Sequence, residues 1–254
     1  MGVSGAQAGP DAPAAFHTLP VMPLGVLFDL DGTLIDSEPR SFQVWTLLFE
    51  SYGVPHTPQL LRGFVGRRGA DVLGELSDLF PGASVDDIIA RIRSFQLRTD
   101  LPPVGPLPGS VAFARELADG GVDLGLVTSA TRAWAEQLLT QIGLRDRFGV
   151  LVSASDVTVG KPDPEGYRLG TSLLGHPPER VVAFEDAPAG VAAAKAAGLT
   201  CVALTTTHHA SELAHADLVV ADLSHVRLPT GEPLTGASAG TGAHEDAEEG
   251  SSRG

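Results

Sequence analysis

Short apolar runs alternate with helical stretches through most of this chain, and that rhythm limits the folds open to it. The strand candidates are almost continuously apolar and lie at 24–29, 122–127, 180–184, 200–204 and 217–220. Residues at helical spacing fill the intervening segments 110–119, 132–142, 164–174 and 188–197. Unbroken apolar strands are typical of parallel strands covered on both faces, and strand–helix alternation indicates βαβ units. We therefore expect an α/β fold with a doubly wound parallel sheet.

One long stretch breaks this rhythm. After the first strand ends near Asp29, no strong strand signal returns before Val122. Within the gap, apolar residues recur at helical spacing, first as Phe42, Trp45, Leu48, Phe49 and Tyr52 and later as Ile88, Ile89, Ile92 and Phe95. The proline-rich segment 101–106 would form a stiff return linker. We expect residues 38–105 to form a small helical cap domain, inserted into a core built from 23–37 and 106–228.

The two ends of the chain differ in composition from the rest. Residues 1–22 are rich in Ala, Gly and Pro and predict a disordered lead-in. Residues 229–254 are rich in Gly, Ser, Ala and acidic residues and predict a disordered acidic tail. Such segments bury too little apolar surface to offset the entropy lost on ordering.

Charge and cysteine content limit the partners. The net charge of −14 argues against a nucleic-acid partner, which favours a basic surface, and against an anionic membrane surface. No apolar run approaches the roughly 20 residues of a membrane span. The single cysteine, Cys201, excludes an intramolecular disulfide framework and fits a reducing cytoplasm. We expect a cytoplasmic protein that is a monomer or a small homo-oligomer.

Two carboxylates follow the first apolar run, in the sequence Phe28-Asp29-Leu30-Asp31-Gly32-Thr33. Burying even one unpaired charge costs several kcal/mol, so a cation is expected to accompany them. Mg2+ is a suitable candidate because it binds oxygen ligands and works beside substrate phosphates. Taken alone, Asp29 and Asp31 also fit a solvated turn.

Other polar residues occupy equivalent places in the pattern. Thr128 and Ser129 follow the second apolar run, Glu185 and Asp186 follow the third, and Lys161 precedes the helix between them. Singly, these residues also fit a helix cap, two loop acids and a surface lysine. Ligands of open α/β sheets bind beyond the carboxyl ends of the strands, where all of these residues would meet. Carboxylates for a metal, hydroxyls and helix amides for phosphoryl oxygens, and an ammonium for the remaining charge together indicate a Mg2+ and phosphate site.

The four segments, in this order, resemble the haloacid dehalogenase superfamily of phosphotransferases over residues 24–222. The shared pattern is DxDGT, a hydrophobic strand ending in Thr or Ser, a Lys, and an acidic pair after another strand. The helical insert after the first motif matches the helical (C1-type) cap of that family. Segments 127–129, 160–164 and 184–191 look most like the sugar- and polyol-phosphate phosphatases. The resemblance implies a haloacid-dehalogenase-like Rossmannoid core that hydrolyses a small phosphorylated metabolite with Mg2+.

The resemblance also implies roles for the acidic residues. Asp29 would be the nucleophile that forms an aspartyl-phosphate, and Asp31 the acid and base that protonates the leaving alcohol and then activates water. Mg2+ would be held by Asp29, the backbone carbonyl of Asp31 and Asp186. Glu185 would be a direct or water-mediated ligand.

The remaining implied roles concern the substrate. Thr128 and the amides of Ser129 and Leu30 would bind the transferring phosphoryl group, and Lys161 would balance the charge of the nucleophile and the phosphate. Gly66-Arg67-Arg68-Gly69 lies between cap helices, where related enzymes often place substrate contacts. Arg67 is therefore a candidate for binding a second polar group of the substrate, although a solvent-facing turn explains the same residues.

Three other functions fit parts of the pattern. A β-phosphoglucomutase-like enzyme would return the phosphoryl group to a sugar, but that family carries a histidine where this chain has Ser41. Phosphoglycolate phosphatase activity stays open because it uses the same core site. A non-catalytic binding protein on the same fold is disfavoured because every expected catalytic position is filled.

Overall fold

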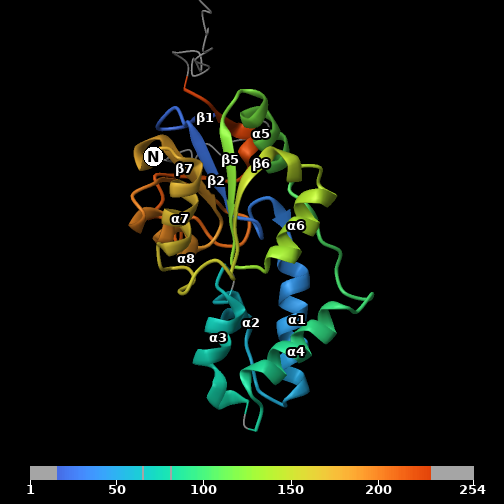
Figure 1. Cartoon of the computed structure of the whole chain (residues 1–254). Helices are drawn as coiled ribbons and strands as arrows, with labels where there is room; N and C mark the ends of the chain where they lie inside the picture. Colours follow the sequence, from blue (N-terminus) through green and yellow to red (C-terminus); the bar gives the residue numbers. More distant parts are fainter. Residues whose placement is uncertain (1–15, 65, 81, 230–254) are drawn as a thin grey trace, which may run out of the picture.

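The computed structural model describes residues 16–64, 66–80 and 82–229. Its centre is a six-stranded sheet whose strands are all parallel, in the order β6-β5-β2-β7-β8-β9 (Figure 1). The strands are β2 (Gly25–Phe28), β5 (Asp123–Val127), β6 (Phe148–Val152), β7 (Val181–Glu185), β8 (Thr200–Leu204) and β9 (Leu218–Val220). The predicted parallel α/β sheet is confirmed.

Strand β6 was absent from the sequence-based prediction. It pairs only with β5 among the described strands and forms one edge of the sheet. Gly149 interrupts its short apolar run and is exposed, because an edge strand is less completely covered than a central one. A glycine inside a strand weakens the strand pattern in a sequence.

Helices cover both faces of the sheet (Figure 1). They are α5 (Pro108–Asp119), α6 (Arg132–Gln141), α7 (Glu165–Leu174) and α8 (Pro188–Ala196). Because successive side chains of a strand point to opposite faces, each strand contributes to two cores. Phe28 and Phe184 stack, with ring centroids 4.9 Å apart, in the core under α5 and α6. Leu27 and Ala183 belong to the core under α7 and α8. This two-sided burial explains the unbroken apolar runs in the sequence.

The segment between β2 and β5 is mainly helical, as predicted. It contains α1 (Glu38–Ser51), α2 (Pro58–Arg62), α3 (Gly69–Glu75) and α4 (Val85–Gln96). These helices surround a hydrophobic cluster of their own, which includes the predicted aromatic stripe around Phe49. Strand β3 (Ile35–Asp36) pairs with β4 (Gly105–Pro106), so the two connections to the sheet run side by side. The helices extend from the end of the sheet at which β2 and β5 finish (Figure 1).

The structure near the two ends of the described residues contradicts one prediction. Strand β1 (His17–Thr18) pairs in parallel with β10 (Val226–Arg227), so the predicted disordered lead-in over 1–22 is wrong for these residues. Leu19 is buried against the core, a contact that composition alone does not reveal. Residues 1–15 of that lead-in, and the predicted tail from residue 230 on, lie outside the described residues.

The described residues also form four single 3₁₀ turns: η1 (Ser77–Leu79), η2 (Arg145–Arg147), η3 (Pro178–Arg180) and η4 (Leu223–His225). Across the described ranges, none of the helices combines the length and apolar character that crossing a bilayer requires.

Candidate active site

The strand order brings the predicted site residues together. Strand β2 lies between β5 and β7, so Asp29, after β2, stands between Thr128, after β5, and Glu185, the last residue of β7. From β2 the chain continues to β5 and β6 on one side and later to β7, β8 and β9 on the other. Such a reversal of strand order is where open α/β sheets bind ligands, at the carboxyl ends of the strands. Lys161 joins them from the loop before α7.

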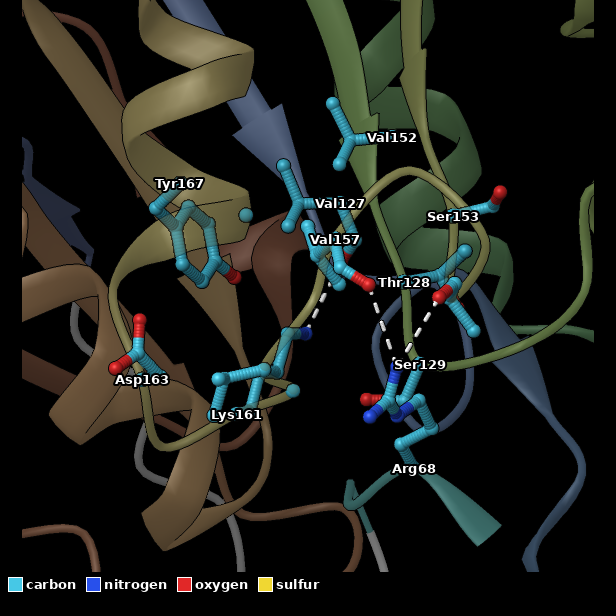
Figure 2. A pocket seen from close by; sticks show the side chains of 14 residues that line it. Arg68, Val127, Thr128, Ser129, Val152, Ser153, Val157, Lys161, Asp163 and Tyr167 are labelled. Carbon is cyan, nitrogen blue, oxygen red and sulfur yellow. Dashed lines mark hydrogen bonds between the residues drawn. The ribbon is translucent and has the colours of Figure 1, made fainter. Parts of the chain in front are cut away.

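Lys161 is buried between these residues, and Figure 2 shows its side chain beside Val127 and Tyr167. Its Nζ donates to Oδ1 of Asp29 at 2.5 Å, to Oε1 of Glu185 at 2.5 Å and to the carbonyl of Val127 at 3.0 Å. Burial by itself lowers the pKa of Lys161, but the charges of Asp29 and Glu185 outweigh it and hold that pKa above its ordinary value. Lys161 is therefore an ammonium with all three of its protons engaged.

The carboxylates carry more charge than this one ammonium balances. Asp29, Glu185 and Asp186 are buried, and one oxygen from each lies within 4.8 Å of the others. Burial and the neighbouring Glu185 raise the pKa of Asp186 to about 8, and burial raises the pKa of Asp29 despite the opposing charge of Lys161. These shifts mean that the protein alone leaves negative charge uncompensated here. Clustered carboxylate oxygens are the ligands that hard divalent cations prefer, so the donor set fits Mg2+.

Asp31 differs from these three residues in its surroundings. It is half-buried, and its Oδ1 accepts a hydrogen bond of 2.5 Å from the hydroxyl of Ser37, at the start of α1. Burial raises the pKa of Asp31, and the bond from Ser37 opposes that rise. A carboxyl group with a raised pKa holds its proton more readily, which suits a general acid.

Two glycines let the backbone approach the carboxylates closely. Gly32 has φ +86°, and a Cβ there would lie 2.1 Å from Oδ2 of Asp186. A Cβ on Gly190, in α8, would lie 2.0 Å from the carboxyl carbon of Glu185. At both positions a side chain would clash with a carboxylate, so only glycine fits. Gly32 also has a left-handed backbone conformation, which favours glycine.

Thr128 and Ser129 make different contacts. Oγ1 of Thr128 accepts from the amide of Ala130 at 3.0 Å, within the loop, whereas the residue that caps α6 is Thr131. That bond uses an oxygen lone pair, so the hydroxyl proton stays available to a phosphoryl oxygen. The hydroxyl of Ser129 donates to the carbonyl of Gly66, in the helical insertion, at 3.0 Å. Ser129 thus joins the sheet edge to the insertion.

The two arginines of the insertion point to different partners. The side chain of Arg67 donates to Glu75 at the end of α3. Arg68 is instead held by Asp71 and also reaches the loop after β6, donating to main-chain carbonyls within 154–158 at 3.0 to 3.4 Å. Figure 2 shows Arg68 in a pocket that Thr128 and Lys161 also line. Sequence reasoning selected Arg67 and overlooked Arg68.

Sequence reasoning also missed two hydroxyl groups beside the carboxylates. The Tyr167 hydroxyl donates to Oε1 of Glu185 at 2.6 Å, and the Thr207 hydroxyl donates to Oδ2 of Asp186 at 2.5 Å. Thr207 follows β8, so the carboxyl-end rule that found the other residues would have found it. His208, the next residue, is half-buried, and its Nδ1 lies 3.2 Å from the carbonyl oxygen of Asp186.

Comparisons with known proteins agree with this geometry. The chain belongs to the haloacid dehalogenase-like hydrolases, whose family model matches residues 24–198. It is 44% identical over 203 residues to validoxylamine A 7′-phosphate phosphatase of Streptomyces hygroscopicus subsp. limoneus, covering 80% of this chain and 95% of that one. It is 33% identical over 215 residues to hexitol phosphatase A of Escherichia coli (strain K12), covering 83% and 97%.

Comparison with a solved structure supports the same fold. CbbY from Rhodobacter sphaeroides, in complex with phosphate, is similar with a TM-score of 0.70 and 26% identity, covering 80% of this chain and 96% of that one. The resemblance inferred from the four motifs is therefore confirmed, and so is the predicted class of hydrolase.

Proposed function

We propose that this chain is a Mg2+-dependent phosphatase that hydrolyses small phosphate monoesters of sugars or polyols. The observation that carries the proposal is the buried cluster of Asp29, Glu185 and Asp186 around Lys161, at the carboxyl edge of the sheet. Such a site takes a divalent cation and a phosphoryl group together. The similarity to validoxylamine A 7′-phosphate phosphatase and hexitol phosphatase A supports a phosphorylated polyol or sugar as substrate. The single buried Cys201 fits the reducing cytoplasm.

The chain's own side chains supply the covalent chemistry. A carboxylate oxygen of Asp29 bonds to phosphorus while the bond from phosphorus to the ester oxygen breaks. The proton of the Asp31 carboxyl passes to that oxygen, which leaves as an alcohol. In the second step, Asp31 accepts a proton from water, whose oxygen bonds to phosphorus. The acyl–phosphate bond then breaks, releasing inorganic phosphate and returning Asp29 as a carboxylate.

Charge neutralisation accompanies both steps. Lys161, fixed between Asp29 and Glu185, presents a permanent positive charge beside the nucleophile. Asp29, the backbone carbonyl of Asp31, Asp186 and Glu185 would hold Mg2+, which supplies positive charge for the phosphoryl oxygens. Phosphoryl transfer depends mainly on positioning and charge stabilisation, and this cluster provides both.

Removal of the metal tests the proposal directly. Phosphate release is measured from glycerol phosphates, hexose and deoxyhexose 6-phosphates, hexitol phosphates, validoxylamine A 7′-phosphate, phosphoglycolate and nucleotides. We expect release from at least one sugar or polyol phosphate with Mg2+, loss of release with EDTA, and recovery when excess Mg2+ is added. Absence of release from every substrate with Mg2+ present would contradict the enzyme assignment.

The same screen separates hydrolysis from the mutase reaction. Ser41 is an exposed residue of α1, at the position where β-phosphoglucomutases carry a histidine. We therefore expect glucose 1-phosphate to yield inorganic phosphate or no product. Conversion of glucose 1-phosphate to glucose 6-phosphate would instead establish the mutase alternative.

The insertion α1–α4 is proposed to act as the cap of this site. Arg68 supports this role because it spans from α3 to the loop that precedes Lys161, and Ser129 meets Gly66 beside it. We expect Arg68→Ala to lower kcat/KM about tenfold, the effect of losing charged hydrogen bonds that hold the cap on the site.

Arg67→Ala is the matched comparison for Arg68→Ala. Arg67 pairs with Glu75 within the insertion, at a partly exposed position. Loss of such a pair has little effect, so kcat/KM is expected to change by no more than about twofold. A larger loss for Arg67→Ala than for Arg68→Ala would support the substrate contact that the sequence suggested at Arg67.

A further inference from the structure

The carboxylate of Glu185 is held by two donors on one oxygen. Tyr167, a fully buried residue of α7, donates from Oη to Oε1 of Glu185 at 2.6 Å. Lys161 donates to that same oxygen at 2.5 Å. The other oxygen, Oε2, accepts a longer bond of 3.3 Å from the amide of Asp186. The two short bonds fix the orientation of the carboxylate and leave Oε2 with the larger remaining capacity to bind a cation.

Asp186 is held in a similar way, by a residue that follows it in the sequence. Thr207, in the loop after β8, donates from Oγ1 to Oδ2 of Asp186 at 2.5 Å. The Nδ1 atom of His208 lies 2.9 Å from that same hydroxyl. The hydroxyl of Thr33 is a weaker donor to the other oxygen, Oδ1, at 3.4 Å. Asp186 therefore has one strongly engaged oxygen and one weakly engaged oxygen, as Glu185 does.

We propose that Tyr167 and Thr207 are positioning residues for the metal, each acting through one carboxylate ligand. This inference rests on the proposed function. Neither residue belongs to the four motifs, yet both hydroxyls end on carboxylate oxygens of the predicted Mg2+ ligands Glu185 and Asp186. A carboxylate free to rotate loses conformational entropy when it binds a cation, whereas one already held by a hydrogen bond does not. Outer hydrogen-bond partners of this kind typically contribute 10- to 100-fold in metal affinity or activity.

The test removes each hydroxyl without removing the side chain. Mg2+ affinity of the full-length, metal-free protein is measured by titration calorimetry for Tyr167→Phe and Thr207→Val. We expect each variant to bind Mg2+ about 10- to 100-fold more weakly than the unaltered chain. We also expect kcat to return to within about threefold at saturating Mg2+, because the reacting groups themselves are unchanged. Thr207→Ser retains the hydroxyl and should keep the affinity within about twofold.

Thr171→Val is the matched control. Thr171 is buried on the same helix as Tyr167, and its hydroxyl donates to the main-chain carbonyl of Tyr167 at 2.7 Å, not to a carboxylate. This variant loses a buried hydroxyl on α7 but should leave Mg2+ affinity unchanged. Urea unfolding of each metal-free variant shows whether it is folded. If Tyr167→Phe does not fold, Thr207→Val and Thr207→Ser still decide whether the hydroxyl sets affinity.

The outcomes separate this inference from the proposed function. If the unaltered chain binds Mg2+ and Tyr167→Phe and Thr207→Val bind it equally well, the inference is wrong and the proposed function stands. If Thr171→Val weakens binding as much as they do, the effect is one of packing and the inference is also wrong. If the unaltered chain neither binds Mg2+ nor releases phosphate from any substrate, the proposed function itself fails.

Discussion

Asp29→Asn is expected to lower kcat by at least about a thousandfold while leaving the fold intact. The amide that replaces the carboxylate cannot form the aspartyl-phosphate. Turnover is therefore lost, because the proposed mechanism has no second nucleophile. The fold should persist because the substitution is nearly isosteric and Lys161 keeps its bond to Glu185. The backbone bond from the Asp29 amide to the carbonyl of Phe184, at 2.9 Å, is also unaffected.

Steady-state phosphate release with saturating Mg2+ measures this loss, and far-ultraviolet circular dichroism checks the fold. Asp31→Asn is the informative comparison, since it removes the acid and not the nucleophile. Asp31→Asn should recover part of its activity on a substrate with a good leaving group, such as p-nitrophenyl phosphate. Asp29→Asn should recover none. Retention of even about a tenth of normal activity in Asp29→Asn would contradict its assignment as nucleophile.

The position of the site could be predicted because chain order and strand ends were enough to place it. Asp29, Thr128 and Glu185 each stand at the carboxyl end of an apolar run, and parallel strands bring such ends to one edge. Lys161 required one further premise, that a loop before a helix at this edge faces the same site. In the structure, Lys161 contacts both Asp29 and Glu185.

The supporting contacts could not be predicted in the same way. The bond from Tyr167 to Glu185 depends on the rotation of α7 against β7, which a helical pattern in the sequence does not specify to the level of one hydroxyl. The contact of Arg68 depends on how the insertion meets the loop 154–158. Strand β1 forms only through pairing with β10, about two hundred residues away in the chain, as their register shows.

Lys161→Met is expected to have the largest effect on stability. In the described part of the chain, the ammonium of Lys161 contacts the buried carboxylates of Asp29 and Glu185. It also donates to the carbonyl of Val127. Methionine fills a similar volume but leaves Asp29 and Glu185 without their shared donor. Removing one partner of a buried ion pair costs about 3–5 kcal/mol because an uncompensated charge remains. We expect the free energy of unfolding of the metal-free protein to fall by about that amount.

Lys195→Met provides the surface control for this prediction. Lys195 also bonds a carboxylate, that of Asp217 at 2.6 Å, but both side chains are 36% exposed. An exposed pair contributes about 0–1 kcal/mol, so urea unfolding in EDTA should distinguish the two lysines clearly. Added Mg2+ should restore part of the stability of Lys161→Met, since the cation compensates the same carboxylates, but not its turnover. Equal losses in the two variants would show that the central ammonium does not balance the buried charge, and the metal–phosphate site would lose its main physical support.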